Sequence, residues 1–188
     1  KGWFALGLTY QRNGDYDSAI NALDSAVGAD PTNVKALVQK AKILMKQGDY
    51  KSAEGAYNQA IQVDPSYGAA YADLGQIYVT QERWDDAISA LSTATALDTR
   101  LYKAWFLLAQ SQNVKGSCDD AKESSRSSLD VKSGYAPAHY ELGIAEICLG
   151  NKTAALASFE NARKDRSWRK NAEYEIDKIK NPEKYRNP

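Results

Sequence analysis

The sequence predicts an all-α protein built from stacked helix pairs, and the main reason is an internal period of 34 residues. An alanine keeps this step five times, at Ala19, Ala53, Ala87, Ala121 and Ala155. Two further positions keep it, a small residue (Gly7, Ala41, Gly75, Ala109 and Gly143) and a glycine (Gly14, Gly48, Gly116 and Gly150, with Glu82 as the exception). A fixed period of a few tens of residues is typical of proteins made of stacked repeats.

The first helix of each unit is predicted from an apolar stripe. In residues 3–10, the stripe places residues at i, i+3, i+4 and i+7 on one helix face, and it consists of Trp3, Leu6, Gly7 and Tyr10. Gly14 suits the end of this helix, and Asp15 is expected to cap the next one. The equivalent cap position holds Asp49, Ser117 and Asn151 in other units, with Arg83 as the exception.

The second helix of the first unit is predicted from another stripe, formed by Ala19, Ile20, Leu23, Ala26 and Val27. It is expected to stop at Asp30-Pro31, because proline cannot continue a helix, and Asp64-Pro65 repeats that stop. A hairpin of two such helices cannot bury its apolar face alone, so the units must stack on one another.

These residues carry a family resemblance. The pattern Trp3-x-x-Leu6-Gly7-x-x-Tyr10, followed by Gly14, Tyr16, Ala19, Leu23, Ala26 and Pro31, resembles the tetratricopeptide repeat. Residues 71–94 match nearly as well, through Tyr71, Leu74, Gly75, Tyr78, Trp84, Ala87, Leu91 and Ala94. The resemblance covers about residues 1–169 and implies a right-handed superhelical solenoid of antiparallel helix hairpins.

Some positions depart from the family pattern. Lys40 stands where leucine is usual, Gln112 and Glu146 stand where tyrosine is usual, and His139 replaces a large aromatic residue. The fourth unit departs most, with Ser124, Ser125, Ser127 and Ser128 along its second helix. We therefore expect that helix to bury little surface.

The predicted units are residues 1–33, 34–67, 68–101, 102–135 and 136–169. The first begins with its tryptophan already at Trp3, so we expect further chain upstream. Residues 170–181 are expected to form a capping helix with a stripe of Trp168, Ala172, Ile176 and Ile179, followed by a loose tail over 182–188.

Composition narrows the function further. Lysine plus arginine equals aspartate plus glutamate at 24 each, so we expect neither nucleic-acid binding nor attraction to an anionic membrane. No apolar run approaches the roughly 18 residues of a membrane-spanning helix, so direct membrane insertion is not expected. The short basic run over residues 163–170 is a weaker argument for RNA, because its Trp168 is better used in the capping stripe.

No catalytic, metal or cofactor site is expected. The lone histidine, His139, is interpreted as a packed side chain with a hydrogen-bond partner, and the two cysteines lack metal-ligand spacing. Asp85-Asp86 and Asp119-Asp120 begin second helices, where carboxylates favour the positive end of the helix dipole.

Cys118 and Cys148 lie at ends that neighbouring units bring together, so a disulfide is conceivable. Two separate thiols are the preferred interpretation, because intracellular cysteines are usually reduced. A cytoplasmic location is slightly favoured, and the compartment stays open because a leader or anchor could precede residue 1.

In this family, function resides in the concave groove that the first helices line. The resemblance therefore implies that the groove residues can be assigned from their position within each repeat. Its expected members are Phe4, Leu8, Arg12, Lys35, Val38, Gln39, Lys42, Met45, Lys46, Asp73, Gln76, Lys103, Phe106, Gln110, Asn113, Tyr140 and Ile144. The same face also carries Gln11, Leu107 and Glu141. Basic groups outnumber acidic ones there, which favours a peptide or helix with apolar anchors and acidic side chains.

The leading hypothesis is therefore a non-catalytic protein-interaction scaffold. The carboxylate clamp of chaperone adaptors in this family is not expected, because only Lys103 matches its pattern. Two alternatives remain open: a self-assembling structural element that forms homo-oligomers, and the regulatory repeat region of a larger enzyme.

Overall fold

The computed structural model describes residues 2–185, and residues 1 and 186–188, with the end of the expected tail, lie outside this range. The described chain is helical throughout and contains no strand. Its elements are α1 (Gly2–Arg12), α2 (Tyr16–Ala29), α3 (Val34–Gln47), α4 (Tyr50–Val63), α5 (Gly68–Thr80), α6 (Trp84–Leu97), α7 (Tyr102–Lys115), α8 (Cys118–Val131), α9 (Ala136–Cys148), α10 (Lys152–Ala162), α11 (Arg169–Lys180) and the 3-10 helix η1 (Pro182–Tyr185).

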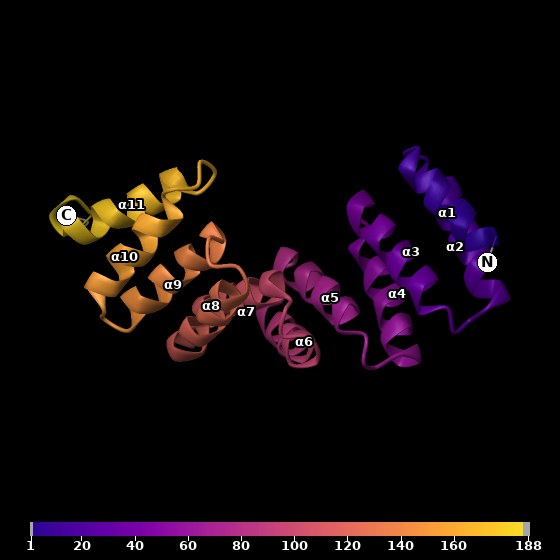
Figure 1. Cartoon of the computed structure of the whole chain (residues 1–188), viewed down its shortest axis with the longest axis horizontal. Helices are drawn as coiled ribbons and strands as arrows, with labels where there is room; N and C mark the ends of the chain where they lie inside the picture. The colour runs from indigo at the N-terminus through magenta and orange to yellow at the C-terminus, as the bar shows by residue number, and fades with distance from the viewer. Residues whose placement is uncertain (1, 186–188) are drawn as a thin grey trace.

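Consecutive helices pack as pairs, from α1 with α2 to α9 with α10, and α11 packs on α10. The pairs follow one another along an elongated molecule, with the two ends of the chain far apart (Figure 1). The all-α solenoid expected from the sequence is confirmed, and the helices fit about five repeats plus a closing helix.

The array bends toward its first helices. Helix α5 packs directly on α7, and α7 on α9, whereas no contact of comparable extent joins α4 to α6 or α6 to α8. The first helices therefore lie side by side on the inner, concave face, and the second helices spread apart on the outer, convex face (Figure 1).

The alanine ladder is buried within each pair. Its five members, Ala19, Ala53, Ala87, Ala121 and Ala155, are all 0% exposed, as the register predicts. The facing small residue is just as constrained, because a Cβ added at Gly75 would lie 2.5 Å from Cγ of Leu91. A larger side chain at either place would have to push the two helices apart.

Helix ends follow the sequence expectation in part. Asp15 and Asp49 cap α2 and α4 by accepting hydrogen bonds from the backbone N–H of Ser18 and Ser52, at 3.1 and 3.0 Å. Ser117 and Asn151, expected to act in the same way, make no side-chain cap. The Asn151 side chain instead donates its amide N–H to Oε2 of Glu146 at 2.8 Å. Its hydrogen-bond partner is therefore a carboxylate and not the first turn of α10.

The first unit differs from the expected buried stripe. Trp3 is 52% exposed and Leu6 is 38% exposed. The equivalent tryptophan of the fourth unit, Trp105, packs beside the second helix of the preceding unit, where Thr95 and Ala96 lie. Within the described residues no pair precedes α1, so Trp3 has no such neighbour.

The expectation that the second helix of the fourth unit buries little is wrong. In α8, Ser124, Ser125 and Ser128 are all buried, together with Ala121. The Ser128 hydroxyl donates to the carbonyl oxygen of Tyr102 at 2.7 Å, which satisfies it inside the core. Ser124 and Ser128 stand where alanine stands in most other units, whereas Ser125 stands where the other units have leucine, tyrosine or phenylalanine.

The preference for two free thiols is also wrong, because Cys118 and Cys148 form a disulfide with a Cα–Cα distance of 6.0 Å. It links the start of α8 to the end of α9, and so joins the fourth unit to the fifth. The same two register positions in the first and second units hold Tyr16 and Lys46, whose ammonium lies 4.9 Å from the ring centroid. The repeat geometry therefore brings this pair of positions together more than once.

The C-terminal helix α11 buries Ala172 and Ile176 against the last pair. Residues 182–185 are more ordered than the expected loose tail, since Lys184 and Tyr185 bind the Asp177 carboxylate at 2.9 and 2.6 Å. Hydrogen bonds from Lys184, Tyr185 and Asn181 lower the pKa of Asp177 to about 2.

Candidate functional site

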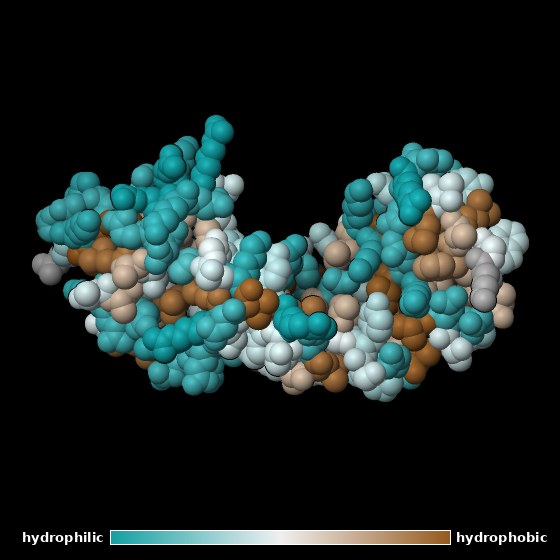
Figure 2. All heavy atoms as spheres, viewed as in Figure 1, coloured by the Kyte–Doolittle hydropathy of each residue, from teal (hydrophilic) through white to brown (hydrophobic). Residues whose placement is uncertain are grey.

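The concave face forms a hollow between the two ends of the molecule, and hydrophilic residues predominate along its rim (Figure 2). Five helices contribute side chains to it: α1, α3, α5, α7 and α9. Because α3, α5, α7 and α9 pack on one another and Gln39 of α3 bonds Gln11 of α1, residues one repeat apart form rows along the hollow, which is called the groove below.

Basic side chains of the groove are concentrated on α1 and α3, and one more lies on α7. The exposed cations that the register placed on this face are Arg12, Lys35, Lys42, Lys46 and Lys103. Two of them have partners within the chain: Nζ of Lys42 lies 3.6 Å from Oδ2 of Asp73, and Lys46 lies over the ring of Tyr16. Side chains this exposed are strongly screened by salt, so both pairs can yield to another partner.

One row along the groove is polar and links neighbouring first helices. Gln39 donates to Oε1 of Gln11 at 2.6 Å, joining α3 to α1. Asn113 donates to Oε2 of Glu141 at 2.8 Å and to the Glu141 carbonyl oxygen at 2.9 Å, joining α7 to α9 at the same register positions. Because its amide already bridges the two helices, Asn113 is committed within the chain, unlike the exposed lysines.

Asp73 occupies the same row between these two bridges. Its Oδ2 accepts a hydrogen bond from the Tyr57 hydroxyl at 3.2 Å, in addition to the contact with Lys42. Burial raises the pKa of Asp73, and Lys42 and Tyr57 offset only part of this rise.

Glu141 is the most unusual charge in the groove. It is 6% exposed, and no lysine or arginine within the described chain forms an ion pair with it. Burial raises its pKa to about 7, and the hydrogen bond from Asn113, which acts in the opposite direction, does not cancel this effect. The sequence placed Glu141 on this face, but its burial could not be foreseen, since that depends on how closely α7 and α9 approach.

The apolar members of the groove differ in how much surface they present. Six are half-buried, namely Phe4, Leu8, Met45, Phe106, Tyr140 and Ile144. Val38, expected as an anchor, is 3% exposed and belongs to the central core cluster. It therefore has no surface to offer a partner, and that assignment is wrong.

Aromatic packing fixes two of the half-buried residues. Phe106 meets the ring of Tyr135 edge-on at a centroid distance of 5.6 Å. Tyr140 packs on Phe159 and Trp168 at ring-centroid distances of 5.5 and 5.2 Å.

Two glutamines of the groove, Gln76 on α5 and Gln110 on α7, are also half-buried. They occupy the register position that Lys42 holds on α3.

Other site types find little support in residues 2–185. No group of three or more potential metal ligands occurs there, and no described helix has the length and apolar character to cross a membrane. Nε2 of His139 lies 2.8 Å from the carbonyl oxygen of Ser133, and burial lowers the pKa of this imidazole. This agrees with a packed histidine that has a hydrogen-bond partner.

A stack of helix pairs with an open concave face defines a helical-repeat interaction scaffold. Two family models, both described as Tetratricopeptide repeat, match residues 4–68 and 44–110, and together they span more than half of the chain. The chain belongs to the tetratricopeptide repeat family.

Solved structures agree with this family. One crystal structure of MamA is 28% identical with a TM-score of 0.78, and the match covers 85% of this chain and 93% of that chain. Another MamA structure is 27% identical with a TM-score of 0.78, covering 95% of this chain and 93% of that one. YrrB, with a TM-score of 0.80 and 19% identity over 92% of this chain and 89% of its own, shares the fold. No match was found among curated protein sequences.

Proposed function

We propose that this protein is a non-catalytic scaffold that holds a peptide or helical segment of another protein in its groove. The observation that carries the proposal is the combination of exposed cations with half-buried apolar side chains on one concave face. Membership of a repeat family of interaction modules supports the scaffold role. YrrB, which has the same fold, is described as a tetratricopeptide repeat protein with an unusual peptide-binding site.

The chemistry of the groove favours a partner with acidic side chains and apolar anchors. Lys35, Lys42 and Lys103 are exposed, and the proposed apolar anchors are Phe4, Met45 and Phe106. Apolar anchors supply most of the affinity in such interfaces, whereas exposed charges steer encounter and orientation. Glu141 adds a polarity along the groove, because its helix α9 carries no lysine.

A displayed peptide library panned against the purified chain tests this proposal, because such a library presents many different peptides at once. Enriched peptides should carry acidic residues beside apolar ones, and their binding should weaken as salt increases. The double variant Lys42→Glu with Lys46→Glu should weaken binding and flatten its salt dependence while helical content is unchanged.

A matched control makes the same charge change outside the groove, with Lys51→Glu on α4 and Lys152→Glu on α10, both exposed. This control should bind the selected peptides as the unmodified chain does. If the groove variant binds equally well at low salt, or if enriched peptides are basic, the groove proposal fails.

Self-assembly is a second candidate function, favoured by the exposed Trp3 and Leu6 at the N-terminal edge. Large apolar side chains that are exposed side by side mark interaction surfaces. Light scattering over a range of protein concentrations should then show a mass that rises with concentration, and Trp3→Ser should abolish the rise. A constant monomer mass at all concentrations would reject this function.

A further inference from the structure

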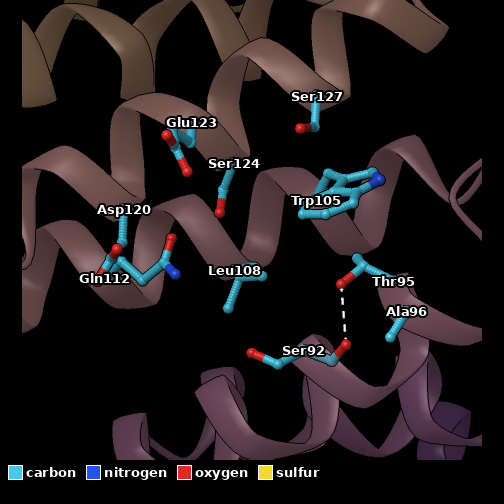
Figure 3. Close-up of a pocket in the computed structure, with 10 residues that line it drawn as sticks. All are labelled: Ser92, Thr95, Ala96, Trp105, Leu108, Gln112, Asp120, Glu123, Ser124 and Ser127. Atoms are coloured by element: carbon cyan, nitrogen blue, oxygen red, sulfur yellow. Dashed lines mark hydrogen bonds between the residues drawn. The ribbon is translucent and has the colours of Figure 1, made fainter.

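A second concave site lies away from the groove, between the second helices α6 and α8 and above α7 (Figure 3). It encloses about 310 Å³, at the lower end of the range of roughly 300–1,000 Å³ that small-molecule sites occupy. It exists because the second helices spread apart on the convex face, and none of the groove residues named above lines it.

The charge of this pocket is negative and uncompensated. Asp120 and Glu123 of α8 line it, and no lysine, arginine or histidine does. Neither carboxylate forms an ion pair within the described residues. The corresponding aspartate of the third unit, Asp86, is paired with Arg83 at 2.8 Å, so the repeat does not leave this position unpaired everywhere.

The buried wall of the pocket adds hydrogen-bonding groups that lack partners. Ser124 is 3% exposed, its hydroxyl makes no hydrogen bond within the described residues, and that hydroxyl points into the pocket (Figure 3). Oε1 of Gln112 is buried without a donor. Buried polar atoms normally have a partner, so the unpaired amide oxygen of Gln112 indicates that something else satisfies it, and the Ser124 hydroxyl is free to contribute to the same site.

The remaining polar wall also acts as an acceptor. The Thr95 hydroxyl donates its proton to the backbone oxygens of Leu91 and Ser92, at 2.9 and 3.1 Å, which leaves its oxygen lone pairs for other donors. The third-unit counterpart of Gln112 is Tyr78, whose hydroxyl is already bound to Glu54 at 3.0 Å. Glutamine in place of tyrosine therefore both removes a ring and leaves an unused oxygen.

Trp105 completes the site with an aromatic surface. Its Nε1–H donates to the carbonyl oxygen of Thr99 at 2.9 Å, which fixes the plane of the indole. The ring lies between α6 and α8 at one side of the pocket (Figure 3). The face of an indole attracts cations, most strongly where water is partly excluded.

We propose that this pocket binds a protonated amine, carried either by a lysine side chain of a partner or by a free alkyl diamine. An ammonium group has three donors and no acceptor, which matches a wall of two carboxylates, an amide oxygen and hydroxyl oxygens. An anionic ligand would meet the unpaired carboxylates. This site is independent of the groove and of the proposed function.

Two probes test the proposal by NMR on the full chain: 1,5-diaminopentane, and lysine with an acetylated α-amine and an amidated carboxyl group. The indole N–H signal of Trp105, assigned with Trp105→Phe, should shift saturably with at least one probe. Shifts with the diamine alone would identify a free amine as the ligand, and shifts with the lysine derivative would identify a side chain. The neutral analogue 1,5-pentanediol should give no saturable shift.

The double variant Asp120→Asn with Glu123→Gln should weaken binding about tenfold or more, because it removes charge-assisted hydrogen bonds. Asp119→Asn with Asp130→Asn, on exposed carboxylates of α8 outside the pocket, should leave binding unchanged. All four carboxylates are exposed, so circular dichroism should show both variants folded. Absence of a saturable shift with both probes, equal binding of the diol, or undiminished binding by the pocket variant would each overturn the proposal.

Discussion

At the scale of single residues, the buried carboxylate of Glu141 makes the stability of the folded chain depend on pH. Its pKa in the folded chain is about 7, above the ordinary value of 4.5. The folded state therefore keeps a proton that the unfolded chain loses, and stability falls as pH rises from about 4.5 to about 7. At higher pH the carboxyl group is ionised in both states, so its effect on the free energy of unfolding no longer changes with pH.

The substitution Glu141→Gln should remove this dependence, because glutamine keeps an oxygen to accept from Asn113 and carries no charge. Relative to the unmodified chain, the variant should gain up to about 1.4 kcal/mol of unfolding free energy per pH unit across that range. Urea denaturation at several pH values measures the difference in unfolding free energy between the variant and the unmodified chain. Both chains contain His139, so its titration cancels in this difference. Glu173→Gln, on an exposed residue, is the control, and parallel pH profiles for Glu141→Gln and the unmodified chain would contradict the prediction.

Ala87 shows how tightly the ladder constrains each pair. It is 0% exposed on the buried side of α6. Replacing it with leucine should overpack the core at this position and cost roughly 1–3 kcal/mol. Thermal denaturation should show a melting temperature lower by several degrees, whereas Ser89→Leu on the exposed side of α6 should change it little. An unchanged melting temperature for Ala87→Leu would show that the helices can separate without cost.

At the scale of elements, contacts between units repeat by register while their chemistry changes. Tyr78 binds Glu54 across the second and third units. Two repeats further along the chain, the same two positions hold Glu146 and Lys122, which form an ion pair at 3.1 Å. Burial raises the pKa of Glu146, but hydrogen bonds from Asn151 and Lys122 outweigh this effect and lower it. The fold fixes which positions meet, and the side chains decide how each junction is held.

The disulfide between α8 and α9 should stabilise the junction of the fourth and fifth units. It closes a span of 30 residues, for which restricting the unfolded chain is worth typically about 2–4 kcal/mol. Cys118→Ser with Cys148→Ser should lower the unfolding free energy by that amount in urea denaturation. The unmodified chain in reductant should match the variant, and equal stability with and without reductant would contradict this prediction.

At the scale of the whole molecule, each unit is stabilised mainly by its neighbours, so protection should vary along the array. Helix α1 buries only Gly7, whereas α3 buries six residues between its neighbours. Hydrogen exchange should therefore be faster for the amides of residues 6–12 than for those of residues 40–47. Equal protection in the two helices would mean that α1 is held by contacts other than side-chain burial.

The sequence by itself determined the fold and much of its interior. The 34-residue period is a local property, since each hairpin is built from residues close together in the chain. Helix spacing, the buried alanines and the family could therefore be inferred without coordinates. The groove candidates also followed from register, and most of them lie on half-buried or exposed positions of the first helices.

Only the tertiary structure decided what depends on the distance and rotation between neighbouring units. Those two quantities bury Val38 and Glu141, join Cys118 to Cys148 and open the pocket beside Trp105. A periodic sequence specifies which positions recur, but small rotations accumulate from unit to unit and set which side chains touch. For that reason the register predicted where side chains lie along each helix, and the packing between helices decided which of them remain available to a partner.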